Sequence, residues 1–144
     1  MSHKIVIDTN IWVSYFINAR TDYLIGWIAD HPVDVYTSDE LSDEIEEVLA
    51  RPKFKKQFPF PVRDFIRLHR QACVTVKITR QYNLAPDPDD NFLFDLCKKV
   101  NADYLVTSDK KLLSHKTAFS LAIITFNELR SKFLRVENLS GLKK

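Results

Sequence analysis

Glycine is scarce in this sequence of 144 residues, and its scarcity excludes several ways of binding phosphate. Only Gly26 and Gly141 are present, far apart along the chain. A loop that cradles a phosphate with backbone N–H groups needs several glycines close together. The sequence therefore excludes a Walker P-loop, a G-x-G-x-x-G dinucleotide turn, a kinase-type loop and the G-x-S-x-G nucleophile elbow.

Cysteine and histidine are also too few for the common zinc sites. Two cysteines, Cys73 and Cys97, cannot build a four-cysteine zinc site or a disulfide framework, and we expect both in the core. The four histidines stand alone, without an H-E-x-x-H motif. No apolar run approaches the roughly 20 residues that span a bilayer, and residues 1–4 lead directly into a strand instead of a signal peptide. We therefore expect a cytoplasmic protein.

Charge is almost balanced, with 21 basic and 19 acidic residues, but it is unevenly distributed along the chain. Residues 21–50 hold nine acids and no lysine or arginine, whereas residues 51–70 hold seven bases and one acid. This division indicates either a cation site beside a polyanion-binding patch or two solvated helix faces, and charge alone favours the second. The basic segment includes Arg51, Lys53, Lys55 and Lys56, interleaved with phenylalanines that either stack on bases or pack locally.

Short apolar segments alternate with segments of helical periodicity along the whole chain. Strands are predicted at 4–7, 33–36, 74–78, 103–107 and 121–124, and helices at about 10–18, 21–30, 38–49, 62–72, 88–100 and beyond 126. Two capping boxes, Thr37 with Glu40 and Thr125 with Glu128, open two of these helices. The alternation predicts an α/β fold, a mainly parallel sheet between two layers of helices. We expect one domain over residues 1–144, with about the last eight residues as a flexible tail.

Several carboxylates fall near the carboxyl ends of the predicted strands, where open parallel sheets bind ligands. Helix capping and the helix dipole account for most of the acids at helix starts. Asp8 and Asp109 are harder to explain, because a carboxylate that ends a buried strand is unfavourable unless something pairs with it. A divalent cation supplies that pairing, and oxygen ligands favour Mg²⁺ or Mn²⁺ over zinc. The acids concerned are Asp8, Glu40, Glu44, Asp87, Asp89, Asp90 and Asp109.

Helical geometry distinguishes among the acids of the segment 38–49. Glu44 lies roughly 85° from the centre of the apolar stripe and Glu40 roughly 125°. Glu44 is therefore expected at the edge of the core, with residues 46 and 47 facing solvent. The same geometry places Asp89 nearer than Asp90 to the apolar face of the helix that follows, although the first turn of a helix is poorly placed by this reasoning.

Four short motifs follow one another along the chain: D-T-N at 8–10, E-I-E-E-V-L at 44–49, D-P-D-D-N at 87–91 and L-V-T-S-D at 105–109. Together, and in this order, they resemble the PIN-domain nucleases over about the whole chain. The segment R-P-K-F at 51–54 resembles the bacterial and archaeal, VapC-like branch, whose members are described as toxin components of toxin–antitoxin pairs. The resemblance implies a Rossmann-like three-layer domain, metal-dependent hydrolysis of RNA phosphodiester bonds and often a homodimer.

The resemblance also implies an acidic quartet, Asp8, Glu44, Asp90 and Asp109, that holds one or two Mg²⁺ or Mn²⁺ ions. It favours Asp90 over Asp89, because the residues three and seven positions after Asp90 fit the family's packing positions. Helical geometry favours Asp89 instead, so both stay open. Supporting polar groups near the metals are Asn10 and either Thr107 or Ser108.

Two functions therefore compete. The first is a metal-dependent endoribonuclease that acts on single-stranded RNA, as the toxin of a toxin–antitoxin pair, with an antitoxin protein as partner and no membrane. The second is a catalytically weak PIN module that binds nucleic acid or protein and regulates. A response-regulator receiver or a haloacid-dehalogenase-type phosphatase fits worse, because Thr9 and Asn10 follow Asp8 where those families need a second acid.

Overall fold

The computed structural model describes residues 2–55, 61–79, 90–115 and 120–142. Its centre is a sheet of five parallel strands in the order β3-β2-β1-β4-β5. The central position of β1 brings the carboxyl ends of β1 and β4 together as neighbours. The strands are β1 (His3–Ile7), β2 (Val33–Thr37), β3 (Val74–Thr75), β4 (Tyr104–Val106) and β5 (Ala122–Ile124).

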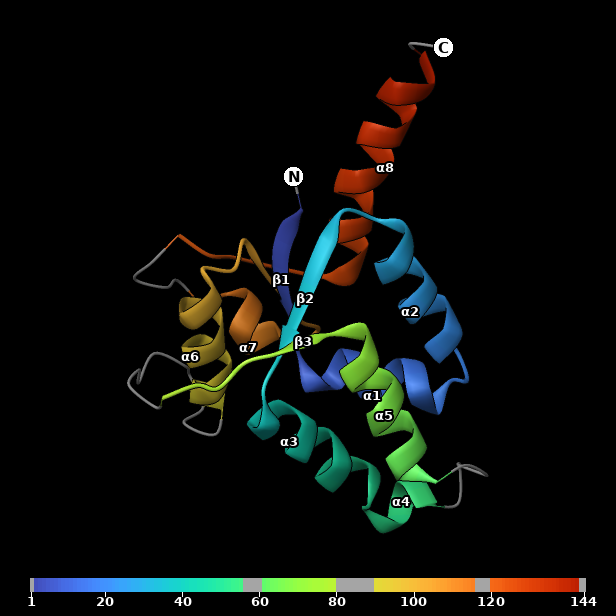
Figure 1. The fold of residues 1–144 in the computed structure, drawn as a ribbon, viewed down its shortest axis with the longest axis vertical. Helices are drawn as coiled ribbons and strands as arrows, with labels where there is room; N and C mark the ends of the chain where they lie inside the picture. Colours follow the sequence, from blue (N-terminus) through green and yellow to red (C-terminus); the bar gives the residue numbers. More distant parts are fainter. Residues whose placement is uncertain (1, 56–60, 80–89, 116–119, 143–144) are drawn as a thin grey trace.

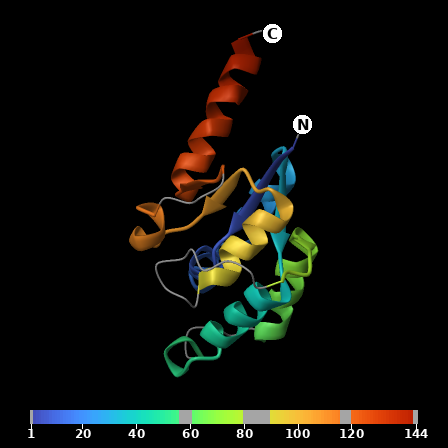
Figure 2. The same cartoon turned by 90° about the vertical axis from the view of Figure 1, so that its left-hand side faces the viewer.

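Helices cover both faces of this sheet, which confirms the predicted three-layer α/β/α fold. One face carries α6 (Asn91–Val100) and α7 (Lys110–Leu113), and the other carries α1 (Thr9–Ile17), α2 (Thr21–Asp30) and α5 (Val62–Ala72) (Figures 1 and 2). At the carboxyl edge lies α3 (Asp39–Leu49), followed by the short α4 (Pro52–Lys55). The last helix, α8 (Phe126–Leu142), passes the amino edge and extends away from the sheet (Figure 1). It includes most of the segment in which we expect a tail.

The helix limits agree closely with the periodicity for α2 and α5, whereas the strands differ at their ends. β3 is confined to Val74–Thr75 instead of continuing to residue 78, and it lies at the edge of the sheet. A strand with a partner on one side has only one ladder of hydrogen bonds to extend it. The predicted start of the helix at residue 88 lies outside the described residues, within which α6 begins at Asn91.

The predicted capping box at Thr37 is wrong. β2 continues through Thr37, so the cap moves one residue along the chain to Ser38, whose hydroxyl accepts the N–H of Leu41 at 3.2 Å. Thr37 is instead fully buried, and its hydroxyl is hydrogen-bonded to Nε2 of His69 at 2.9 Å.

The second capping box is confirmed at the start of α8. The N–H of Glu128 donates to the Thr125 hydroxyl at 3.1 Å, and the N–H of Thr125 donates to Glu128 Oε1 at 3.2 Å. This reciprocal pair satisfies two backbone donors at a helix start.

The core has apolar side chains on both faces of β1. Trp12, Phe65 and Phe94 are the largest side chains that are completely or almost completely buried. Phe65 packs against Phe16 with ring centroids 4.1 Å apart, so this phenylalanine of the basic segment belongs to the core. Cys97 is buried, as expected, and Cys73 is half-buried. No helix among residues 2–55, 61–79, 90–115 and 120–142 is long and apolar enough to cross a membrane.

Burial of His69 makes the stability of the fold dependent on pH. Burial lowers the pKa of His69 from 6.5 to about 4, with a smaller lowering by Arg70. The unfolded chain therefore takes up a proton at higher pH than the folded chain, and stability is lost as the pH falls from 6.5 to about 4. The full loss is roughly 3 kcal/mol.

A His69→Gln variant isolates this effect, because glutamine keeps a polar partner for Thr37 and does not titrate. We expect the difference in unfolding free energy between the two proteins, measured with urea, to change by roughly 3 kcal/mol between neutral and acid pH. A difference that is constant with pH would contradict the assignment.

Candidate active site

A chain of hydrogen bonds joins the carboxyl ends of β1 and β4. Asp8 follows β1 at the start of α1 and is only 5% exposed. The buried hydroxyl of Thr107 donates to Asp8 Oδ2 at 2.7 Å and accepts the N–H of Asp109 at 3.0 Å. Asp109 in turn caps α7 by accepting the N–H of Lys111 at 2.9 Å. Thr107 thus connects two acids that the sequence places at neighbouring strand ends.

Glu44 approaches the same edge from α3. The hydroxyl of Thr9, which is buried at the start of α1, donates to Glu44 Oε2 at 3.1 Å. Glu44 is half-buried whereas Glu46 and Glu47 are exposed, as the helical geometry predicted. The contact of Thr9 with Glu44 is not predicted from the sequence, because it joins residues 35 positions apart.

The pKa shifts show that these carboxylates lie within electrostatic reach of one another. Burial raises the pKa of Asp8, and the charge of Asp109 raises it further. Burial raises the pKa of Glu44 to about 7, and the charges of Asp8 and Asp90 act in the same direction. Two neighbouring acids with raised pKa values are typical of a site that binds a cation or takes up a proton.

The remaining predicted residues differ in their exposure, and some of them lie outside the described residues. Asp90 precedes α6 as its N-terminal cap residue and is half-buried. Asp89 lies outside the described residues, as does Asp87. Asn10 and Ser108 are exposed, and within the described part of the chain no hydrogen bond joins either side chain to the acids.

The donor set fits a hard divalent cation in its chemistry, because it consists of carboxylate and hydroxyl oxygens. In the described parts of the chain, no three carboxylate, histidine or cysteine side chains lie close enough together to hold one ion. Burial makes the ionised forms of Asp8 and Glu44 unfavourable. The hydrogen bonds from the two threonine hydroxyls offset this cost only in part. A cation would offset the rest.

The basic residues follow α3, the helix that carries Glu44. Arg51 and Lys53 are exposed, and the ammonium group of Lys53 lies 4.8 Å from the centroid of the Phe54 ring. Lys55 ends α4, and Lys56 lies outside the described residues.

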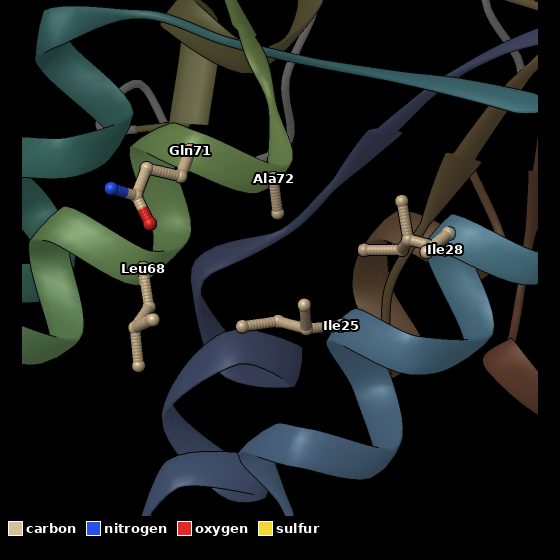
Figure 3. A pocket seen from close by; sticks show the side chains of 6 residues that line it. Ile25, Ile28, Leu68, Gln71 and Ala72 are labelled. Atoms are coloured by element: carbon tan, nitrogen blue, oxygen red, sulfur yellow. The ribbon is translucent and has the colours of Figure 1, made fainter.

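A hollow of about 330 Å³ between α2 and α5 differs from the acidic carboxyl edge in the chemistry of its lining (Figure 3). The side chains that line it are apolar except for Gln71, and none of them is charged. Ile25 and Leu68 face the hollow from opposite helices (Figure 3). This hollow offers no group for acid–base or metal chemistry, unlike the acids at the carboxyl edge, which form the candidate active site.

The fold is that of a PIN domain. The chain belongs to the PIN domain family, whose model matches residues 4–111. PIN domains are generally nucleases that use divalent metals. The chain is also similar to the uncharacterized protein MJ1680 of Methanocaldococcus jannaschii, at 26% identity over 140 residues, which cover 94% of this chain and 82% of the relative.

Proposed function

We propose that this protein is a metal-dependent endoribonuclease that hydrolyses phosphodiester bonds of single-stranded RNA. The observation that carries the proposal is the buried Asp8, linked through Thr107 to Asp109 at the carboxyl edge of the sheet. Nothing in the proposal requires a serine, cysteine or histidine nucleophile. The basic residues Arg51 and Lys53 support an anionic substrate, because both are exposed beside the helix that carries Glu44.

Asp8, Glu44, Asp90 and Asp109 would hold one or two Mg²⁺ or Mn²⁺ ions. A bound ion lowers the pKa of a coordinated water and neutralises charge on the phosphate. Thr107 keeps one oxygen of Asp8 fixed, and Thr9 fixes one oxygen of Glu44. Hydroxyls that orient carboxylates in this way reduce the reorganisation needed at the site.

We further propose the toxin role for this nuclease. The R-P-K-F segment at residues 51–54 supports it. The expected partners are an antitoxin protein and, by family habit, a second copy of this chain. A small neighbouring reading frame that encodes a DNA-binding segment would support the antitoxin.

The test is cleavage of a labelled single-stranded RNA by the purified protein. We expect cleavage with Mg²⁺ or Mn²⁺, products that carry a 5′ phosphate, and loss of activity when EDTA removes the metal. The matched single-stranded DNA serves as a control for the substrate class. Activity that persists in EDTA would contradict metal dependence, and absence of cleavage by the clean protein would contradict the enzyme.

A binding module without turnover is the second candidate. The observation that favours it is the lack, among the described residues, of three side chains gathered closely enough to hold an ion. In that case the protein would bind RNA or a protein partner with the same affinity in Mg²⁺ and in EDTA, and would leave the RNA intact.

A further inference from the structure

Two arginines are held against aromatic rings where α1, α2 and α8 meet. The guanidinium carbon of Arg20 lies 5.4 Å from the ring centroid of Tyr15 and 5.1 Å from that of Tyr23. The guanidinium carbon of Arg130 lies 5.9 Å from the ring centroid of Tyr23 and 5.1 Å from that of Phe126. We call Tyr15, Arg20, Tyr23, Phe126 and Arg130 the arginine–tyrosine cluster.

The charge of this cluster is not neutralised within the described residues. Arg130 donates hydrogen bonds to the Tyr23 hydroxyl, at 2.9 Å, and to the side-chain oxygen of Asn127. Neither Arg20 nor Arg130 forms an ion pair with any carboxylate in the described ranges. Arg70, by contrast, pairs with Asp39 at 3.1 Å. Positive charge fixed by rings and lacking a carboxylate is suited to an anionic ligand.

The cluster borders a hollow of about 470 Å³ between α2 and α8. Tyr23, Trp27, Asn127 and Arg130 are among the side chains that line it. Tyr23 is 42% exposed, so part of this side chain stays open to a ligand beside the two guanidinium groups. The hollow therefore combines an aromatic surface for stacking with an amide and a guanidinium that form hydrogen bonds.

Direct contacts lead from this cluster to the candidate active site. The N–H of Thr107, whose hydroxyl binds Asp8, donates to the carbonyl of Ile124 at 3.0 Å. Phe126 follows two residues later, and its ring meets that of Tyr15 with centroids 5.5 Å apart. The cluster is therefore connected, through Phe126 and Ile124, to the end of β4 that carries Thr107.

We propose that the arginine–tyrosine cluster and its hollow form a second binding subsite for single-stranded RNA, beside the point of cleavage. Arg20 and Arg130 bind backbone phosphates, and Tyr23 stacks on a base. The charge of the two arginines favours a polyanion over an apolar protein segment. Stacking on one exposed ring suits unpaired bases, because bases within a duplex already stack on each other. The inference rests on the proposed function, since it names where that substrate binds.

Binding is measured apart from cleavage by fluorescence anisotropy in EDTA, with a labelled oligouridine of about twelve nucleotides as the probe. We expect Arg20→Gln to weaken binding about three- to tenfold at about 0.1 M salt, and to reduce the slope of log affinity against log salt by about 0.7. Tyr23→Leu should weaken binding about fivefold or more through loss of stacking. Arg20 is exposed, so its variant is expected to fold like the wild type.

Lys132→Gln is the matched control. Lys132 is exposed on α8, and its ammonium group lies 5.6 Å from the centroid of the Tyr104 ring, at the amino end of β4. The variant removes one positive charge from a cation–ring contact at the amino end of β4, the opposite end of that strand from Thr107. We expect its affinity for the probe to stay within about twofold of the wild type.

The outcomes separate this inference from the proposed function. If Arg20→Gln and Tyr23→Leu bind the probe as tightly as the Lys132→Gln control, or if the wild type does not bind it, the subsite is wrong, even when the wild type cleaves RNA. If the cluster variants lose affinity and the wild type fails to cleave with Mg²⁺ or Mn²⁺, the subsite stands and the nuclease proposal falls.

Discussion

Asp8→Asn is expected to lower RNA cleavage by at least ~10³-fold and to leave the folded protein at least as stable as the wild type. The loss corresponds to about 4 kcal/mol of transition-state stabilisation, in the range attributed to a catalytic metal. An asparagine amide carries no charge with which to hold a divalent cation. Asp8 is the most deeply buried of the four acids, so water cannot readily replace its carboxylate.

The stability of the variant follows from the environment of Asp8. Burial raises the pKa of this carboxyl, which means that its ionised form destabilises the folded state at neutral pH. Asparagine removes the charge and keeps a carbonyl oxygen that can accept the Thr107 hydroxyl. The substitution therefore separates catalysis from folding.

Cleavage rates with Mg²⁺ or Mn²⁺ and urea unfolding in EDTA are the two measurements. Asp34→Asn is the matched control, because Asp34 is an exposed acid on the adjacent strand β2, paired in register with Lys4. We expect this control to cleave RNA like the wild type. Cleavage by Asp8→Asn within about tenfold of the wild type would remove Asp8 from the catalytic site.

The fold could be predicted from the sequence because helical periodicity and apolar strand segments are local patterns. The limits of α2 and α5 follow from helical periodicity, and the apolar strands alternate with these helices. Thr37 shows where local reasoning fails. Its capping pattern with Glu40 was real in the sequence, but Thr37 pairs with Thr75 of β3 and its hydroxyl bonds to His69, so β2 extends by one residue. Tertiary contacts decided between two neighbouring candidates for the cap.

The candidate site could be predicted from the sequence only in part, because its hydrogen bonds join residues far apart in the chain. Acids at strand ends can be placed at one edge of a parallel sheet from the order of elements alone. The hydrogen bonds that hold them join residues far apart in sequence, such as Thr107 with Asp8 and Thr9 with Glu44. The family resemblance names Thr107 or Ser108 as a supporting group, whereas Thr9 is missed because threonine is common at helix starts for other reasons. The choice between Asp89 and Asp90 stays a prediction.

Glu44→Gln is expected to lower cleavage by ~10²- to 10³-fold and to change how the stability of the metal-free protein depends on pH. Burial and the charges of Asp8 and Asp90 raise the pKa of Glu44 from 4.5 to about 7. The folded chain thus holds this proton more tightly than the unfolded chain, so stability falls as the pH rises from 4.5 to about 7. Glutamine cannot lose a proton, so it removes this loss.

Urea unfolding in EDTA should therefore find Glu44→Gln more stable than the wild type above about pH 7, with the difference vanishing below 4.5. Partial exposure of Glu44 to solvent reduces the size of the gain but not its sign. Glu46→Gln makes the same change at an exposed position of α3 and should affect neither cleavage nor stability. Equal stability of Glu44→Gln and the wild type at about pH 8 would contradict the raised pKa of Glu44, and with it the burial of this carboxylate beside Asp8 and Asp90. A gain in stability together with a loss of cleavage is the result that a purely structural glutamate would not give, because removing a stabilising contact lowers stability.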